Sequence, residues 1–156
     1  MLYTGYDGKG YQSALAVSDD LLHWKHKGII LGRNQRSSCW DSVGAAATWM
    51  IKDSDHLYDT PGLRKVDGKY WLVYHSYPSV GYEEGAAMIG LAWTEDEELL
   101  DWHRLEKPVF SWENGEDWER GGLYKACIIN YEETWYMFYN AKNRESRWVE
   151  QTGMAS

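Results

Sequence analysis

The stretch WERGGLYK, residues 118–125, organises the chain, and a weaker copy of it, DTPGLRK, stands at residues 59–65. Both copies read acid, two spacer positions, Gly, Leu, one further position and Lys. Each is followed by an aromatic run typical of a strand, at residues 70–74 and 135–139. We therefore expect Asp59 and Glu119 at the same point of a repeated β unit, where they would form part of a ring of acids around one axis.

Three further segments recur around these copies in a fixed order. An inner strand is expected at 59–66, with a hairpin turn after it at Asp67-Gly68, and a loop is expected at 141–148. A strand of small residues is expected at 13–18, 85–94 and 150–156, and an outer strand at 25–31 and 103–110. Between them stands a Leu-x-x-Trp plug, which ends at Trp24 and again at Trp102, 78 residues later. Four strands per unit at this spacing favour β-propeller blades. Turn signals about every 8–12 residues also fit an irregular β-sandwich, which is the runner-up fold.

The expected fold class is therefore all-β, with blades of four antiparallel strands and about two and a half blades in this chain. We expect a single partial propeller domain over residues 1–156. It consists of a blade remnant at 1–31, an irregular linker at 32–58, a full blade at 59–112 and a partial blade at 113–156. Within the linker, the alanine run 45–47 and the residues after it fit either a helical turn or an additional strand, and the sequence does not choose between them.

The charge balance restricts the partners. The 156 residues carry a net charge of −8, and no Lys/Arg cluster exceeds two or three residues. We therefore expect neither nucleic acid nor a membrane as partner, because anionic surfaces require a basic footprint. The chain has 10 Trp and 12 Tyr but only 2 Phe. Aromatic side chains with a polar atom can stack on a sugar and hydrogen-bond to it, although packing in aromatic β-strands explains them equally well.

With these motifs, the chain resembles the five-bladed β-propeller glycoside hydrolases, the superfamily of families 43, 32 and 68. The small-residue strand followed by a plug tryptophan is common in them and is matched at residues 16–24 and 93–102. Family 43 places its general acid in a segment like E-G-P-h-h-Y-K, to which residues 119–125 are similar, with Gly121 replacing the proline. Family 32 places a second acid in an R-D-P segment, to which Asp59-Thr60-Pro61 is similar but inexact.

The sequence departs from this family in two respects. Its enzymes carry a third acid on the first blade, and no residue upstream of Tyr3 supplies one. A five-bladed ring also needs roughly twice this length. The resemblance therefore implies an internal piece, or a homo-oligomer in which chains complete one propeller.

Glycoside hydrolysis uses two carboxyl groups, one that protonates the leaving oxygen and one that activates water or attacks the sugar. The resemblance implies Glu119 as the general acid and Asp59 as a second acid in the same funnel. Alternatively, both acids cap a strand or pair with nearby Arg and Lys side chains. The side chains expected to contact substrate are Trp40, Asp41, His75, Tyr82, Trp118, Tyr124 and Lys125. For the aromatic residues among them, packing between blades is an equal alternative, and Asp41 also fits a turn.

The expected function is therefore that of a glycoside hydrolase-like protein acting on an oligo- or polysaccharide, and a glycosidase if the propeller is completed. The alternative is a non-catalytic carbohydrate-binding or truncated propeller fragment that self-associates. No cofactor or metal is expected, because the H-x-x-H at residues 23–26 lacks a third ligand and the acidic run 95–98 lacks the EF-hand pattern. The N-terminal residues have no signal-peptide pattern, so we expect a cytoplasmic protein, unless a signal peptide has been lost.

Overall fold

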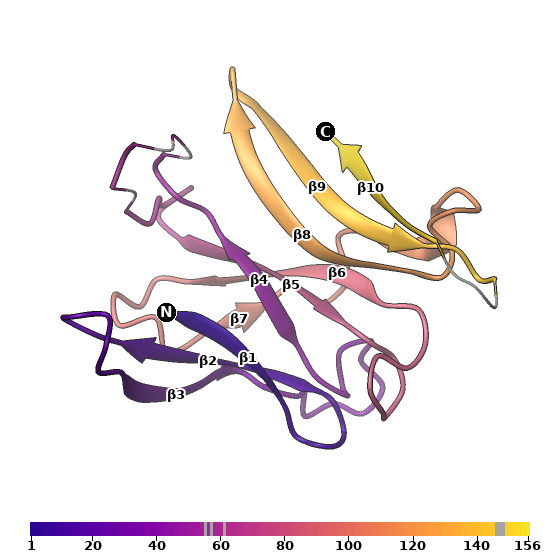
Figure 1. Ribbon diagram of the computed structural model, residues 1–156, viewed down its shortest axis with the longest axis horizontal. Coiled ribbons are helices and arrows are strands. Elements are labelled where there is room, and N and C mark those ends of the chain that lie inside the picture. Colours follow the sequence, from indigo (N-terminus) through magenta and orange to yellow (C-terminus); the bar gives the residue numbers. More distant parts are fainter. Residues whose placement is uncertain (55, 57, 61, 146–148) are drawn as a thin grey trace.

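The structure, a computed structural model, describes residues 1–54, 56, 58–60, 62–145 and 149–156. Its strands form three antiparallel sheets (Figure 1). The first sheet has the order β1-β2-β3, with β1 (Leu2–Tyr6), β2 (Tyr11–Val17) and β3 (Lys25–Leu31). The second has the order β4-β5-β6-β7, with β4 (Ala46–Met50), β5 (Tyr70–Ser76), β6 (Met88–Thr94) and β7 (His103–Arg104). The third has the order β10-β9-β8, with β8 (Gly122–Tyr131), β9 (Thr134–Lys142) and β10 (Glu150–Ala155).

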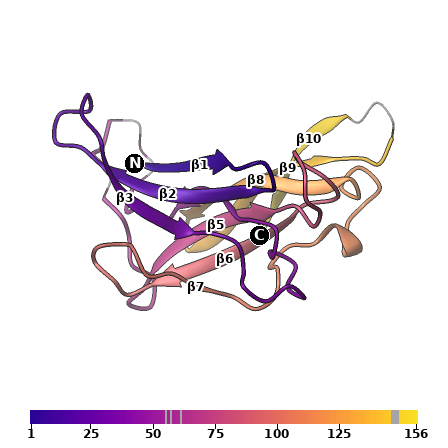
Figure 2. The same cartoon turned by 90° about the horizontal axis from the view of Figure 1, so that it is seen from below.

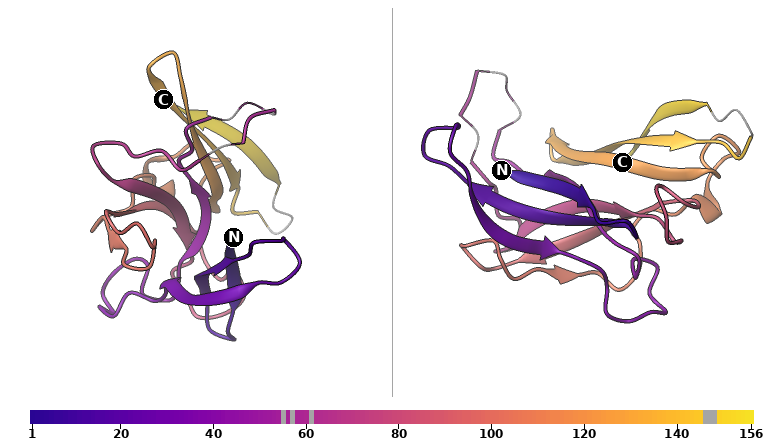
Figure 3. Two further views of the ribbon diagram at one scale, coloured as in Figure 1. Left: turned by 90° about the vertical axis from the view of Figure 1, so that its left-hand side faces the viewer. Right: turned by 60° about the horizontal axis from the view of Figure 1, so that its bottom comes forward.

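The second sheet lies between the other two, as Figures 2 and 3 show from other sides. One apolar core joins the first sheet to the second and includes Leu15, Leu31, Leu72 and Ala92. A separate core joins the second sheet to the third and includes Val73, Ile89, Leu123 and Tyr139. The short 3₁₀ helix η1 (Trp112–Asn114) leads from the second sheet into the third. The all-β fold and the sequence of three, four and three strands confirm the expected partial propeller.

The first strand of the second sheet differs from the prediction. We expected an inner strand at residues 59–66, but the strand that pairs with β5 is β4, which lies in the segment expected to be an irregular linker. The Asp53 N–H donates to Gly62 O (3.1 Å) and Lys52 forms a bridge with Leu63, so the described residues between these two pairs form an excursion from the sheet. The small residues at the start of β4 suit a crowded sheet, and this tertiary packing decides between strand and helix.

The remaining differences are small. The outer strand expected at 103–110 is shorter, with β7 covering two residues and an isolated bridge from Ile89 to Phe110. The hairpin turn expected at Asp67-Gly68 is confirmed, since both residues have positive φ (52° and 77°), as a two-residue hairpin turn requires. Pro61 in the expected acid segment and residues 146–148 in the loop expected after β9 lie outside the described residues.

Candidate functional site

Five tyrosines from all three sheets gather in one group, which we call the tyrosine cluster. Its members are Tyr6, Tyr11, Tyr77, Tyr82 and Tyr124. The ring centroid of Tyr11 lies 5.7 Å from that of Tyr6, 6.2 Å from that of Tyr82 and 6.3 Å from that of Tyr77. The cluster sits where β1 ends and β2 begins, beyond the end of β5, and at the start of β8. It therefore forms a junction of the three sheets.

Two carboxylates reach this cluster. Glu83, in the loop between β5 and β6, accepts a hydrogen bond from the Tyr11 hydroxyl at 3.0 Å. Glu150, the first residue of β10, accepts one from the Tyr124 hydroxyl at 2.6 Å. Burial raises the pKa of the Tyr77 phenol, and the charges of Glu83 and Glu150 raise it further. The same two charges add to burial in raising the pKa of Tyr124. The two acids come from different sheets, and both raise the pKa values of the same two phenols.

Two residues at the tyrosine cluster have a positive φ angle. Glu83 has φ 57° and Lys125 has φ 52°, in the left-handed region that few residues other than Gly adopt. Lys125 lies at the β8 register shift between Tyr124 and Cys127. Lys125 lies inside a strand, whereas the positive φ of Glu83 falls in a connection between strands, as it does at Leu21, Asp67, Leu99, Glu132 and Glu133. Such strain tends to occur at functional sites, where the surrounding structure holds it in place.

His75, on β5, lies against two rings of the cluster. Its ring lies 5.7 Å from that of Tyr77 and 6.2 Å from that of Tyr124. Burial, with a smaller contribution from the charge of Lys125, lowers the pKa of His75 to about 3. The ring is therefore neutral at pH 7. The Lys125 backbone N–H donates to Nδ1 at 3.4 Å, which leaves the ring proton on Nε2.

Two ammonium groups stand beside the phenols. Lys125 Nζ lies 5.3 Å from the centroid of the Tyr124 ring. Lys142 Nζ lies 5.9 Å from the ring centroids of both Tyr77 and Tyr124. Carboxylates, phenols and ammonium groups at one junction can bind a polyhydroxyl ligand and move protons. Among the residues expected to contact substrate, this junction brings together His75, Tyr82, Tyr124 and Lys125.

The other expected residues belong to a repeated packing unit, which we call the Trp-acid-Tyr module. In the second sheet it consists of Trp40, Asp41, Tyr74 and Gly90. In the third sheet, Trp118, Glu119, Tyr139 and Gly153 occupy the same places. Each tryptophan stacks on its tyrosine, with centroids 5.3 Å apart for Trp40 and Tyr74 and 6.1 Å apart for Trp118 and Tyr139. Each tyrosine pairs with its glycine on the next strand, Tyr74 with Gly90 and Tyr139 with Gly153.

The acid of each module is buried and accepts a hydrogen bond from its tyrosine. Asp41 is 1% exposed, accepts from the Tyr74 hydroxyl at 3.0 Å and pairs with Arg104 at 2.8 Å. Glu119 is 5% exposed and accepts from the Tyr139 hydroxyl at 2.5 Å and from the Glu116 N–H at 2.7 Å. Both oxygens of Glu119 are therefore occupied by groups of the protein. This arrangement fits the structural alternative for Glu119 better than the role of an acid open to substrate.

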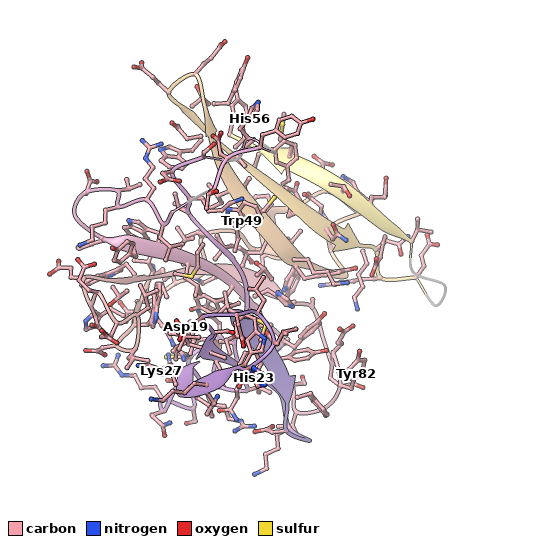
Figure 4. All side chains as sticks on the ribbon, turned by 60° about the vertical axis from the view of Figure 1, so that its left-hand side comes forward. Asp19, His23, Lys27, Trp49, His56 and Tyr82 are labelled. Carbon is pink, nitrogen blue, oxygen red and sulfur yellow. The ribbon has the colours of Figure 1, made fainter. Side chains whose placement is uncertain are left out.

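The described contacts of Asp59 involve neither Glu119 nor the tyrosine cluster. Asp59 lies in the excursion after β4, where it accepts from the Ser54 hydroxyl and pairs with His56 at 3.8 Å. Just after this excursion, Arg64 donates to Asn130 near the end of β8, whereas Glu119 precedes the start of that strand. Ten residues of strand span about 30 Å. Figure 4 likewise shows His56 and Tyr82 on opposite sides of the molecule. The two copies of the segment occupy different places in their sheets, and a funnel that holds both acids stays a prediction from the sequence.

Sequence reasoning did not select Glu83 and Glu150. One signal was present: in both repeats an acid stands near the start of the small-residue strand, before it in YEEGAA at 82–87 and as its first residue in EQTGMA at 150–155. Among the described residues, no group of three or more His, Cys, Asp or Glu side chains is arranged to hold a metal ion. In the same part of the chain, no helix is long and apolar enough to cross a membrane.

Comparison with known proteins agrees with the fold. No protein-family model and no curated protein matches the sequence. A solved structure described as a BT0996 complex with RGII matches with a TM-score of 0.77 and 27% identity, over 98% of this chain and 47% of that chain. One described as "Glycoside hydrolase" matches with a TM-score of 0.77 and 26% identity, over the same shares.

A third structure shows the fold alone, at 20% identity and a TM-score of 0.67, over 99% of this chain and 43% of that one. It is described as "The GH130 family of mannoside phosphorylases contains glycoside hydrolases that target beta-1,2 mannosidic linkages in Candida mannan". The chain thus has the fold of the β-propeller glycoside hydrolases, and the resemblance that the sequence indicated is confirmed. It spans about half the length of the structures that it matches.

Proposed function

We propose that this chain supplies the substrate site of a glycoside hydrolase that acts on an oligo- or polysaccharide, and that Glu83 and Glu150 are its paired carboxylates. One observation carries the proposal. Two acids from different sheets each accept a hydrogen bond from a phenol of the same tyrosine cluster. This choice replaces Asp59 and Glu119, because Asp59 lies far from the cluster and Glu119 has both oxygens engaged.

The proposed chemistry is the two-carboxyl mechanism of glycosidases. One acid protonates the leaving glycosidic oxygen, and the other attacks the anomeric carbon or activates water. The tyrosine hydroxyls orient the two carboxylates by donating to them. The exposed faces of Tyr82 (66% exposed) and Tyr6 (40%) supply a surface on which a sugar ring can stack.

The test is turnover of a panel of 4-nitrophenyl pyranosides and furanosides. Glu83→Gln and Glu150→Gln keep an amide oxygen that accepts from Tyr11 and Tyr124, so the cluster should stay folded. Each is expected to lower kcat by about 10²–10⁴-fold, the usual contribution of a positioned acid or base. Glu84→Gln is the matched control, because it is the neighbouring acid and no described residue bonds to its carboxylate. Turnover that is unchanged in both test variants would refute the assignment.

A second candidate function is carbohydrate binding without hydrolysis. The exposed ring of Tyr82 favours it, because stacking on a sugar needs no free acid. Saturable binding of an oligosaccharide, without any hydrolysis over a long incubation, would support this function.

A homo-oligomer that completes the ring remains part of the proposal. Its test is solution mass by light scattering across a concentration series.

A further inference from the structure

An open polar cavity lies beside the β1–β2 hairpin, next to the tyrosine cluster. Its volume is about 730 Å³, and its lining comes from this hairpin, the segment after β3, the segment before β4 and the loop between β5 and β6. That loop contributes Val80, two residues before Tyr82, so the Cα atoms of these residues lie within about 7 Å of each other. Between them, the Gly81 N–H donates to the Lys9 carbonyl at 3.0 Å. A sugar chain that stacks on Tyr82 can therefore extend into the cavity.

The lining of this cavity is positively charged although the chain as a whole is acidic. Its charged members are Lys9 and Arg33, and no Asp or Glu belongs to it. The chain carries a net charge of −8. An anionic ligand is therefore repelled by most of the protein surface but attracted to this cavity.

Both cationic side chains of the lining have donors to spare. Within the described part of the chain, the Lys9 ammonium has no bonding partner. Asp7 accepts from Arg33 through Nη2 alone, so among the described residues the Nε and Nη1 donors of Arg33 have no acceptor. Hydrogen bonds from such cationic donors to a carboxylate are about twice as strong as neutral ones. The cavity therefore offers two separate cations to one carboxylate.

Asp7 holds these donors in place. It accepts from the backbone N–H groups of Lys9 at 3.1 Å and Gly10 at 3.2 Å, and from Gln12 Nε2 at 2.8 Å. The hydrogen bond from Arg33 lowers the pKa of Asp7 to about 2, so this acid stays ionised at neutral and mildly acidic pH. Arg33 and Gln12 both line the cavity and share this acceptor. A ligand therefore meets donors that are already ordered, which reduces the entropic cost of binding.

The wall formed by residues 32–37 is anchored to the core. The Asn34 backbone N–H donates to the Asp41 carbonyl at 3.2 Å, and its side chain donates to Asp41 Oδ1 at 2.9 Å. Asp41 is the buried acid of the second sheet's Trp-acid-Tyr module. Ser37 and Ser42 add hydroxyl groups to the lining. The wall thus presents fixed neutral donors and acceptors, which suit the hydroxyl groups of a sugar.

We propose that this cavity binds a hexuronic acid through its carboxylate, so that the substrate is an acidic oligosaccharide whose neighbouring sugar lies on the tyrosine cluster. Lys9 and Arg33 donate to the carboxylate, and the exposed side chains of Ile29 and Val80 contact the apolar face of the ring. A single negative charge suits the cavity better than the two of a phosphate, because Asp7 already offsets Arg33. The proposal names the substrate class of the site under Proposed function and rests on that function for cleavage, but not for binding.

The test measures the binding of monosaccharides, because the carboxylate contact needs no neighbouring sugar. D-Glucuronate and D-galacturonate are titrated into the ¹⁵N-labelled full chain and followed by NMR shifts, with their methyl esters as neutral controls of the same shape. At least one acid should bind about tenfold or more tightly than its ester, because a charge-assisted bond contributes about 1.5–3 kcal/mol. The largest shifts should fall at Lys9, Gln12 and Asn34.

Variants of the lining assign this preference to the cavity. Lys9→Gln, which keeps the main-chain bonds of the hairpin, should lower the preference for acid over ester by about threefold or more. The double variant Lys9→Gln/Arg33→Gln should abolish it. Arg36→Gln is the matched control, because Arg36 belongs to the same segment as Arg33 but does not line the cavity. It should leave the preference within about twofold of its original value.

Equal affinities for acid and ester would overturn the proposal, as would a preference that Lys9→Gln leaves unchanged. Tighter binding of D-galactose 6-sulfate or D-glucose 6-phosphate than of either uronate would also overturn it, because the cavity would then belong to another anion. The same titrations in Glu83→Gln and Glu150→Gln separate this proposal from hydrolysis. A uronate preference without any turnover refutes the proposed function alone, whereas turnover of neutral glycosides without a uronate preference refutes this proposal alone.

Discussion

Replacing Asp41 by asparagine should destabilise the protein far more than replacing its counterpart Glu119 by glutamine. The Asp41 carboxylate, 1% exposed, is the counterion of Arg104, whose side chain is 16% exposed. Asp41→Asn removes that charge and leaves the guanidinium buried without compensation. Breaking one side of such a pair costs about 3–5 kcal/mol. For a domain of this size, 1 kcal/mol corresponds to about 2–4 °C in Tm, so Tm should fall by about 6–20 °C.

Glu119→Gln has a smaller expected cost. Its amide oxygen still accepts from the Tyr139 hydroxyl, and among the described residues no cation loses its counterion. We expect a loss of about 1 kcal/mol, the net value of one hydrogen bond. The assay is thermal and urea unfolding of both variants at pH 7, followed by near-ultraviolet circular dichroism.

A double-mutant cycle adds the decisive comparison. Arg104→Met alone should also destabilise the protein, because it leaves Asp41 buried without its cation. The double variant Asp41→Asn/Arg104→Met should lose less than the sum of the two single losses, by at least about 1 kcal/mol. Equal Tm shifts for Asp41→Asn and Glu119→Gln, together with additive losses in the cycle, would refute the reasoning that Arg104 distinguishes the two modules.

Three further predictions concern the site and its support. The folded-state pKa of His75, about 3, lies below its ordinary value of 6.5. Its contribution to stability is therefore complete above pH 6.5 and is lost as pH falls toward 3. Between pH 6.5 and 5, His75→Asn should flatten the fall in unfolding free energy, by up to about 1.4 kcal/mol per pH unit, and identical slopes would contradict this. Gly90→Ala should cost about 1–3 kcal/mol in urea unfolding, because a Cβ there would lie 2.6 Å from Trp40. The matched Gly5→Ala, with no atom within 4 Å, should be nearly neutral, and equal costs would refute the packing argument. Tyr82→Ala should weaken oligosaccharide binding by about 2–10-fold in calorimetry through lost stacking, and unchanged affinity would place the sugar elsewhere.

The order of the strands could be predicted from the sequence because it follows from local features. Aromatic runs, small-residue runs and the Asp67-Gly68 turn each specify a local conformation. The expected strands around β5, β6, β9 and β10 are confirmed for this reason. The inner strand β4 could not be predicted in the same way, because an alanine run suits a helix as well as a crowded sheet, and only its neighbours decide.

The candidate site could be predicted only in part. Asp59 was chosen because the segment 59–65 is similar in sequence to 119–125, which lies 60 residues later. The sheets themselves repeat with an offset of 78 residues, which places Trp118-Glu119 at the position of Trp40-Asp41. The plug tryptophans, Trp24 and Trp102, already have that offset, so the correct alignment was available. An alignment of the repeats could not predict that Glu83 and Glu150 reach the same tyrosine cluster, because this depends on how different sheets pack together.

Locating a bound oligosaccharide on the protein, by crystallography or by NMR shift mapping, would test the proposed sugar site without intermediate steps. A ligand identified in the glycoside panel is used for this purpose. We predict a sugar ring stacked on Tyr82, with its glycosidic oxygen within hydrogen-bond reach of the Glu83 or Glu150 carboxylate. A sugar bound beside Asp59, or at any surface remote from the tyrosine cluster, would contradict the proposal.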